Sequence, residues 1–129
     1  MEFIKAHQRL DAWKKAMDLV IDIYDITKCF PRDERFGIIS QLRRASVSIP
    51  SNIAEGATRS SNKEYIHFLY IALGSCSEID TQMLLCKRIG YVLEKEALEL
   101  IQKIDEVHRI LHGLIRYRES FEVKKELKE

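Results

Sequence analysis

Near the C-terminal end of the sequence, Asp105, His108 and His112 have a spacing that suits metal binding. Residues three or four positions apart project from the same face of a helix, so these side chains would point towards one ion. Carboxylate metal sites in helical bundles need this motif twice, with two further inward carboxylates, and the sequence has no second copy. We therefore interpret both histidines as surface residues beside Asp105, and a carboxylate-bundle metalloprotein remains only an alternative.

Residues for nucleophilic catalysis or nucleotide binding are equally hard to assemble. The segment GSCSE, residues 74–78, lacks the G-x-S-x-G spacing of a nucleophile elbow. The segment NIAEGATRSS, residues 52–61, lacks the lysine of a phosphate-binding P-loop. We expect Cys76 and Cys86 to pack as hydrophobic side chains. The sequence therefore predicts no catalytic residue, no cofactor and no enzymatic activity.

Basic residues are the remaining candidates for a binding surface. Between Arg32 and Lys63 the chain has six basic residues against three acidic ones. Such side chains contact nucleic-acid phosphates, and the N-terminus of a helix adds backbone amides that attract anions. We expect Arg43 and Arg44 on the outer face of their helix; the alternatives are solvated side chains or arginines that hold a subunit interface. The predicted nucleic-acid-binding residues are Arg43, Arg44, Arg59, Lys63, Lys87, Arg88, Arg109 and Arg116.

Four helices would position these side chains. Apolar residues recur at alternating spacings of three and four, which is typical of helices with a buried face. Short connections favour an all-α, antiparallel up-and-down four-helix bundle that forms a single domain over residues 1–129. The predicted helices span approximately residues 11–28, 34–55, 62–88 and 94–120, and a frayed tail covers 121–129.

The second predicted helix contains Pro50. The apolar spacing continues through this residue, although proline inside a helix removes a hydrogen bond and costs roughly 3 kcal/mol. We predict a helix that is kinked near Pro50, with a short strand over SVSIPS, residues 46–51, as the alternative. We expect Asp33 to cap the start of this helix and Gly56 to end it in the left-handed conformation.

The third predicted helix is apolar on more than one side. A stripe from Tyr65 to Cys86 follows the helical spacing, and residues such as Phe68 cover the other sides. Ser61 and Glu64 have the spacing of a capping box at its start. A helix that is apolar nearly all round is buried on several sides, so we predict a subunit interface here as well as core packing.

Composition narrows the class of protein. A chain of 129 residues with 46% hydrophobic and 32% charged residues is typical of one globular domain. The net charge of +1 means that a charge-driven partner must meet a local patch. The three cysteines form no CxxC pair, and neither a signal peptide nor a membrane span is evident. We therefore expect a cytoplasmic protein that does not contact membranes.

Three segments carry a family resemblance: FPRDERFG at 30–37, SQLRRASVSIPSNIAEG at 40–56 and ALGSCSEIDTQ at 72–82. With them, the chain from about Arg9 to Arg118 resembles the bacterial four-helix-bundle family of proteins encoded in 23S rRNA intervening sequences. The resemblance implies a bundle that assembles into a ring-shaped homopentamer. It also implies kinship with the accessory protein of diversity-generating retroelements, which binds nucleic acid and a reverse transcriptase through basic surface.

Taken together, these observations predict a non-enzymatic, oligomeric accessory or adaptor protein that contacts RNA or DNA phosphates, alongside a protein partner. The main alternative is a structural or protein-interaction scaffold that does not bind nucleic acid. In that case the basic residues would serve assembly and solubility.

Overall fold

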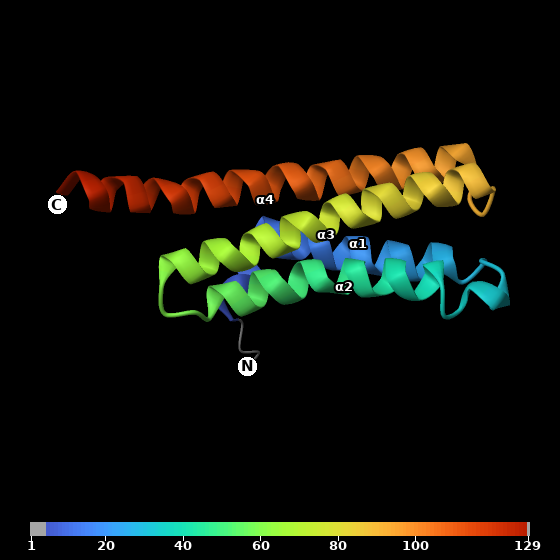
Figure 1. Cartoon of the computed structure of the whole chain (residues 1–129), viewed down its shortest axis with the longest axis horizontal. Helices are drawn as coiled ribbons and strands as arrows, with labels where there is room; N and C mark the ends of the chain where they lie inside the picture. Colours follow the sequence, from blue (N-terminus) through green and yellow to red (C-terminus); the bar gives the residue numbers. More distant parts are fainter. Residues whose placement is uncertain (1–4, 129) are drawn as a thin grey trace.

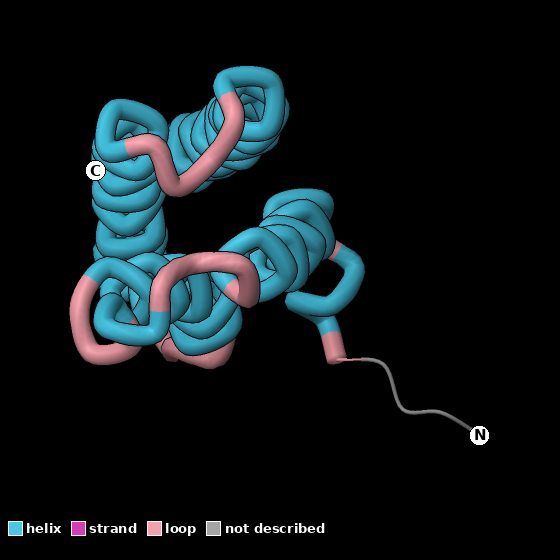
Figure 2. The backbone as a smooth tube through the Cα atoms, turned by 90° about the vertical axis from the view of Figure 1, so that its right-hand side faces the viewer, coloured by secondary structure: helices cyan, strands magenta, loops and turns pink. Residues whose placement is uncertain are grey.

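The structure is a computed structural model that describes residues 5–128, and long helices make up most of it (Figure 1). Successive helices run in opposite directions in Figure 1, and the helix pairs in contact are α1–α2, α2–α3, α3–α4 and α1–α4. The view towards the helix ends in Figure 2 shows them arranged around a common centre. The predicted four-helix bundle is thus confirmed. Its helices are α1 (Asp11–Thr27), α2 (Ile38–Ala57), α3 (Asn62–Ile89) and α4 (Glu94–Lys128).

The buried face of α1 consists mostly of small and aliphatic residues. The almost fully buried residues of this face are Ala12, Ala16, Leu19 and Ile23. The small alanine side chains let the neighbouring helices approach closely. A second apolar stripe on α1 runs along the boundary with α2 and is only partly covered; Met17 in this stripe keeps 38% of its surface exposed.

The connection between α1 and α2 differs from the prediction. Asp33 does not cap the second helix; it lies in a short 3-10 turn, η2 (Arg32–Glu34). The amide of Gly37 donates to the Glu34 carbonyl over 3.0 Å, and α2 then begins at Ile38 without a side-chain cap. The predicted start near residue 34 was therefore four residues too early.

The helix α2 continues through Pro50, so the alternative of a strand over residues 46–51 is wrong. Pro50 is buried beside Ile49, and apolar packing offsets the hydrogen bond that the Ser46 carbonyl loses. The bend at this residue stays a prediction.

The role predicted for Gly56 is wrong. Gly56 is buried inside α2, which ends at Ala57, and the left-handed glycine found in the described residues is Gly90, with φ of 96°. A Cβ atom on Gly56 would lie 2.9 Å from the Cβ atom of Phe68 and 3.1 Å from the Tyr65 carbonyl oxygen. Gly56 is needed for close contact between α2 and α3.

The ends of the last two helices follow from local hydrogen bonds and helix propensity. Ser61 caps α3, as predicted, because its hydroxyl oxygen accepts a hydrogen bond of 3.1 Å from the amide of Glu64. The fourth helix does not end near residue 120: α4 continues to Lys128 and extends beyond its neighbours in Figure 1. Residue 129 of the expected tail lies outside the described residues.

Candidate nucleic-acid interface

Five basic residues meet where α1 turns into α2. Two adjoining hollows share Arg35, Ile39 and Arg43 in their linings. Arg44 lines the first hollow, and Lys28 with Arg32 lines the second. We call Lys28, Arg32, Arg35, Arg43 and Arg44 the basic corner.

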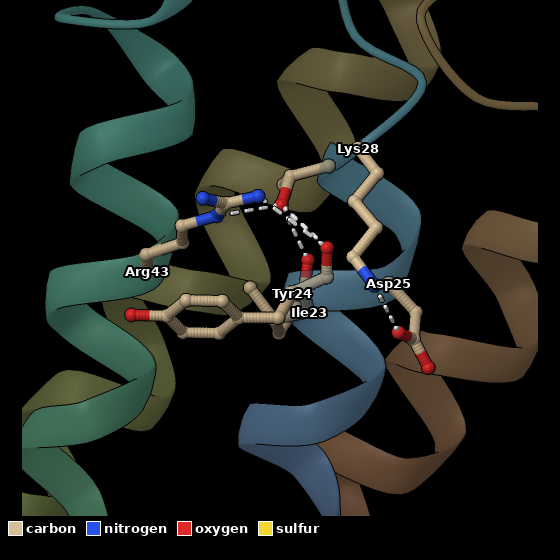
Figure 3. A network of polar contacts seen from close by, with 6 residues as sticks. Ile23, Tyr24, Asp25, Lys28 and Arg43 are labelled. Atoms are coloured by element: carbon tan, nitrogen blue, oxygen red, sulfur yellow. Dashed lines mark hydrogen bonds and ion pairs between the residues drawn. The ribbon is translucent and has the colours of Figure 1, made fainter.

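Arg43 is fixed against α1, as Figure 3 shows. Its Nε atom donates a hydrogen bond of 2.9 Å to Thr27 Oγ1, and its guanidinium carbon lies 4.5 Å from the centre of the Tyr24 ring. The Thr27 hydroxyl is itself buried and donates to the Ile23 carbonyl over 2.7 Å. The prediction that Arg43 lies on the outer face is therefore wrong, because its side chain fills the boundary between α1 and α2. Its neighbour Arg44 is exposed, as predicted.

The basic corner has a local excess of positive charge. Asp25, Asp33 and Glu34 are close in sequence, but the residues described as lining the two hollows include no acidic side chain. Asp25 Oδ1 lies 3.4 Å from Lys28 Nζ, and both side chains are largely exposed. Burial raises the pKa of Tyr91, and the nearby carboxylates of Glu34 and Asp33 raise it further. The described linings of both hollows thus contain basic side chains and no carboxylate.

Lys87 and Arg88 lie at the same end of the bundle as the basic corner. The rings of Phe30 and Tyr91, 5.4 Å apart, join the α1–α2 and α3–α4 connections there. Lys87 Nζ lies 3.3 Å from Glu94 Oε1, so part of its charge is neutralised. Neither Lys87 nor Arg88 lines the two hollows.

The remaining predicted residues are elsewhere on the molecule. Arg59 and Lys63 lie at the opposite end, around the α2–α3 connection, and Arg116 lies on the part of α4 that runs to that end. Arg59 forms an ion pair with Glu55, and its guanidinium carbon lies 4.7 Å from the centre of the Phe68 ring. Arg109 is exposed midway along α4. The predicted set is thus distributed over the surface rather than gathered in one patch.

Sequence reasoning counted Arg32 and Arg35 in the local excess of charge but left them out of the predicted site, and Lys28 was missed. All three flank or lie within FPRDERFG, residues 30–37, where a proline and a glycine bracket two arginines and two acidic residues. A sharp turn at this segment brings residues before and after it to the same corner, and that turn was the available signal.

The residues considered for nucleophilic or metal chemistry are the buried cysteines and the group of Asp105, His108 and His112. Cys76 and Cys86 are buried, as predicted, and burial raises the pKa of their thiols to about 12 and about 11. Thiols with such pKa values are protonated and unreactive at neutral pH. The rings of His108 and His112 stack with their centres 6.2 Å apart, and Asp105 is exposed. Across residues 5–128, no group of three or more histidine, cysteine, aspartate or glutamate side chains could hold a metal ion.

The helices within residues 5–128 also lack the combination of length and apolar character that a membrane-spanning segment needs.

Comparison with known proteins identifies the family. The chain is similar to a crystal structure of a protein of unknown function from the S23 ribosomal protein family of Bacteroides thetaiotaomicron VPI-5482. The TM-score is 0.75 at 23% sequence identity, and the alignment covers 81% of this chain and 97% of that one. This likeness concerns the fold. No curated protein matches the chain. The sequence profile of the 23S rRNA-intervening sequence proteins matches residues 8–113, and the chain belongs to this family.

Proposed function

We propose that this protein is a non-enzymatic, oligomeric adaptor whose basic corner binds the phosphates of RNA or DNA. The observation that carries the proposal is the gathering of Lys28, Arg32, Arg35, Arg43 and Arg44 around two hollows whose described linings contain no carboxylate. The family is named after an intervening sequence of 23S rRNA, which agrees with a nucleic-acid partner.

The geometry of the corner suits phosphate better than a small neutral ligand. Guanidinium groups donate paired hydrogen bonds that match phosphate oxygens, and four of the five basic residues are arginines. Arg43 is already held in place by Thr27 and Tyr24, so less conformational freedom is lost when an anion binds. The hollows are open, which suits a polymer that passes across the surface.

One corner provides only a few phosphate contacts, so association of several copies is part of the proposal. On α3, Tyr70, Ile71, Leu84, Leu85 and Ile89 keep between 39% and 56% of their surfaces exposed. Apolar residues of this number on one helix favour contact with another subunit. Each added subunit repeats the basic corner, and linked weak contacts bind one strand more tightly than any single contact does.

A salt titration tests phosphate binding directly. The logarithm of the association constant should fall linearly with the logarithm of salt concentration, because bound phosphates release counterions. Arg35→Ala together with Arg44→Ala removes two exposed charges and spares Arg43, which supports the fold. We expect the affinity of this double variant to be about 10- to 100-fold lower at low salt. The slope of the logarithm of the association constant against the logarithm of salt concentration should become less steep by about 1.4 for each corner that contacts a single strand.

The matched control is Lys14→Ala with Lys125→Ala. Both lysines are exposed, both lie outside the hollows, and the change in net charge is the same. This variant should bind like the wild-type protein. The proposal would be contradicted if the wild-type protein did not bind at low salt, or if its binding did not depend on salt. An equal loss of affinity in both variants would show that the basic corner is not the binding site.

A protein-interaction scaffold is the second candidate function, and one observation favours it. An almost wholly apolar groove follows the boundary between α1 and α2, next to the basic corner, and Val47 lines both. The other lining residues of the groove are Trp13, Met17, Val20, Pro50, Ser51 and Ala54. The scaffold would be favoured by stable oligomers that bind no nucleic acid at any salt concentration. These oligomers should also bind a protein partner, and Val47→Glu should release that partner.

A further inference from the structure

Two phenylalanines lie in the connection between α1 and α2, and one is buried whereas the other is exposed. Phe30 is 6% exposed and packs against Tyr91, whereas Phe36, six residues later, is 90% exposed. Leaving a large aromatic ring in water gives up the favourable burial of its apolar surface. Only an external partner would recover that contribution.

Local structure holds Phe36 at this position. The turn η2 precedes it, the hydrogen bond from the Gly37 amide to the Glu34 carbonyl closes the turn, and the first bond of α2 runs from the Gln41 amide to the Gly37 carbonyl over 3.1 Å. Phe36 therefore stands on a closed turn between two helical segments rather than in a free chain end.

The surroundings of Phe36 combine aromatic faces with positive charge. Phe36 lines the first hollow of the basic corner together with Tyr24, Arg43 and Arg44. The guanidinium carbon of Arg35 lies 5.5 Å from the centre of the Phe36 ring, much as Arg43 lies 4.5 Å from that of Tyr24. The hollow thus offers two aromatic rings, each with an adjacent arginine.

Unpaired nucleic acid matches this combination. In a single strand the phosphates can meet the arginines while a base exposes its flat face to an aromatic ring. In a duplex the bases are stacked on one another, so no base face is available to Phe36. An acidic peptide would satisfy the arginines but would leave the ring without a stacking partner.

We infer that Phe36 is a base-stacking platform and that the basic corner selects single-stranded over double-stranded nucleic acid. This inference rests on the proposed function and adds the kind of strand and the residue that recognises it. Stacking is tolerant of sequence because every base has a flat face, so the corner discriminates by strandedness.

Fluorescence anisotropy with four probes of one length tests the inference: a single-stranded RNA, a single-stranded DNA of the same sequence, the DNA duplex, and a single strand in which most sites are abasic. Phe36→Ala should weaken binding of the RNA or the DNA single strand by about 5- to 100-fold. Binding of the duplex and the abasic strand should change less than twofold, because their phosphates are still contacted. The relative affinities of the RNA and DNA arms show which strand is preferred.

Two further substitutions separate stacking from general apolar contact. Phe36→Trp keeps an aromatic face and should bind the single strand at least as well as the wild type, whereas Phe36→Leu keeps apolar surface and should behave like Phe36→Ala. Leu93→Ala is the matched control, because Leu93 is 71% exposed in the α3–α4 connection at the same end of the bundle. It should leave binding unchanged.

The possible results distinguish a failure of the stacking inference from a failure of the proposed function. Salt-dependent binding that is unaffected by Phe36→Ala would overturn the stacking role and leave the phosphate-binding proposal intact. Failure of the wild-type protein to bind any probe would overturn both. A fall in the mass of the oligomer on Phe36→Ala would show that the ring contacts a second copy of the chain, which also overturns the inference.

Discussion

Arg43 supports the fold and also lines the proposed binding surface. Its guanidinium group donates to Thr27 Oγ1, also lies 3.5 Å from the Tyr24 carbonyl oxygen, and covers the Tyr24 ring. These contacts join α1 to α2 at the end of the bundle where the chain turns. Arg43 also lines both hollows of the basic corner, so the same side chain borders the proposed anion site.

Arg43→Ala should therefore lower stability as well as binding. We expect the free energy of unfolding to fall by about 1–3 kcal/mol, because a hydrogen bond from a charged group and a cation–π contact are lost. Arg44→Ala is the control: this exposed neighbour has none of these contacts, and its effect should stay within about 0.5 kcal/mol. Urea denaturation followed by circular dichroism measures both. Equal effects would mean that Arg43 does not support the fold.

Only part of this arrangement could be predicted from the sequence. Adjacent residues on a helix point about 100° apart, so Arg43 and Arg44 cannot both pack equally closely against α1. Which of them borders α1 depends on the order in which the helices surround the core, and the apolar spacing of a single helix carries no information on that order. The corner depends on the same order, since its residues come from α1, the connection and α2.

At the scale of the element, Gly56 sets the distance between α2 and α3. Gly56→Ala would place a Cβ atom against Phe68 and the backbone of Tyr65, and we expect a loss of about 1–3 kcal/mol in unfolding free energy from overpacking. Gly113→Ala in α4 is the matched control, because a Cβ atom there meets nothing within 4 Å. Alanine at this position should raise stability by about 0.5–1 kcal/mol. Thermal or urea unfolding of both variants gives the comparison, and a stabilised Gly56→Ala variant would contradict the close contact.

The helices were predictable where periodicity or a cap marked them. The four apolar stripes and the Ser61 cap carried most of the information. Two errors have physical causes. Gly56 was assigned to a helix end because glycine favours left-handed turns, but here it was needed for packing between helices. The tail was expected to fray because it is charged, yet glutamate, lysine and leucine are good helix formers, and α4 continues to Lys128.

At the scale of the whole molecule, the near-neutral charge does not argue against an anionic partner. The net charge of +1 is an average over 21 basic and 20 acidic residues. Acidic side chains gather between α1 and α4, where Asp22, Asp25, Glu96 and Glu99 line one hollow with Lys103. The basic corner lies at the end of the α1–α2 boundary. The proposed phosphate binding requires only a local positive field at the corner.

The proposed association of subunits through α3 leads to a further prediction. Leu85 is 47% exposed on the outer side of α3, and Leu85→Glu would place a charge in a contact between subunits. We expect this variant to dissociate at micromolar concentration while keeping its helical circular dichroism spectrum. Val123→Glu, at a residue 55% exposed on the protruding part of α4, should leave the mass unchanged. An oligomer that survives Leu85→Glu would place the interface elsewhere.

Sedimentation of nuclease-treated protein, alone and with a single-stranded oligonucleotide, tests the central claim of an oligomer that binds nucleic acid. We predict a species whose mass is a whole-number multiple, at least twofold, of the 15.1 kDa chain, and which carries the oligonucleotide with it at low salt and releases it at high salt. A stable 15.1 kDa species that leaves the oligonucleotide free in solution at low salt would contradict the account.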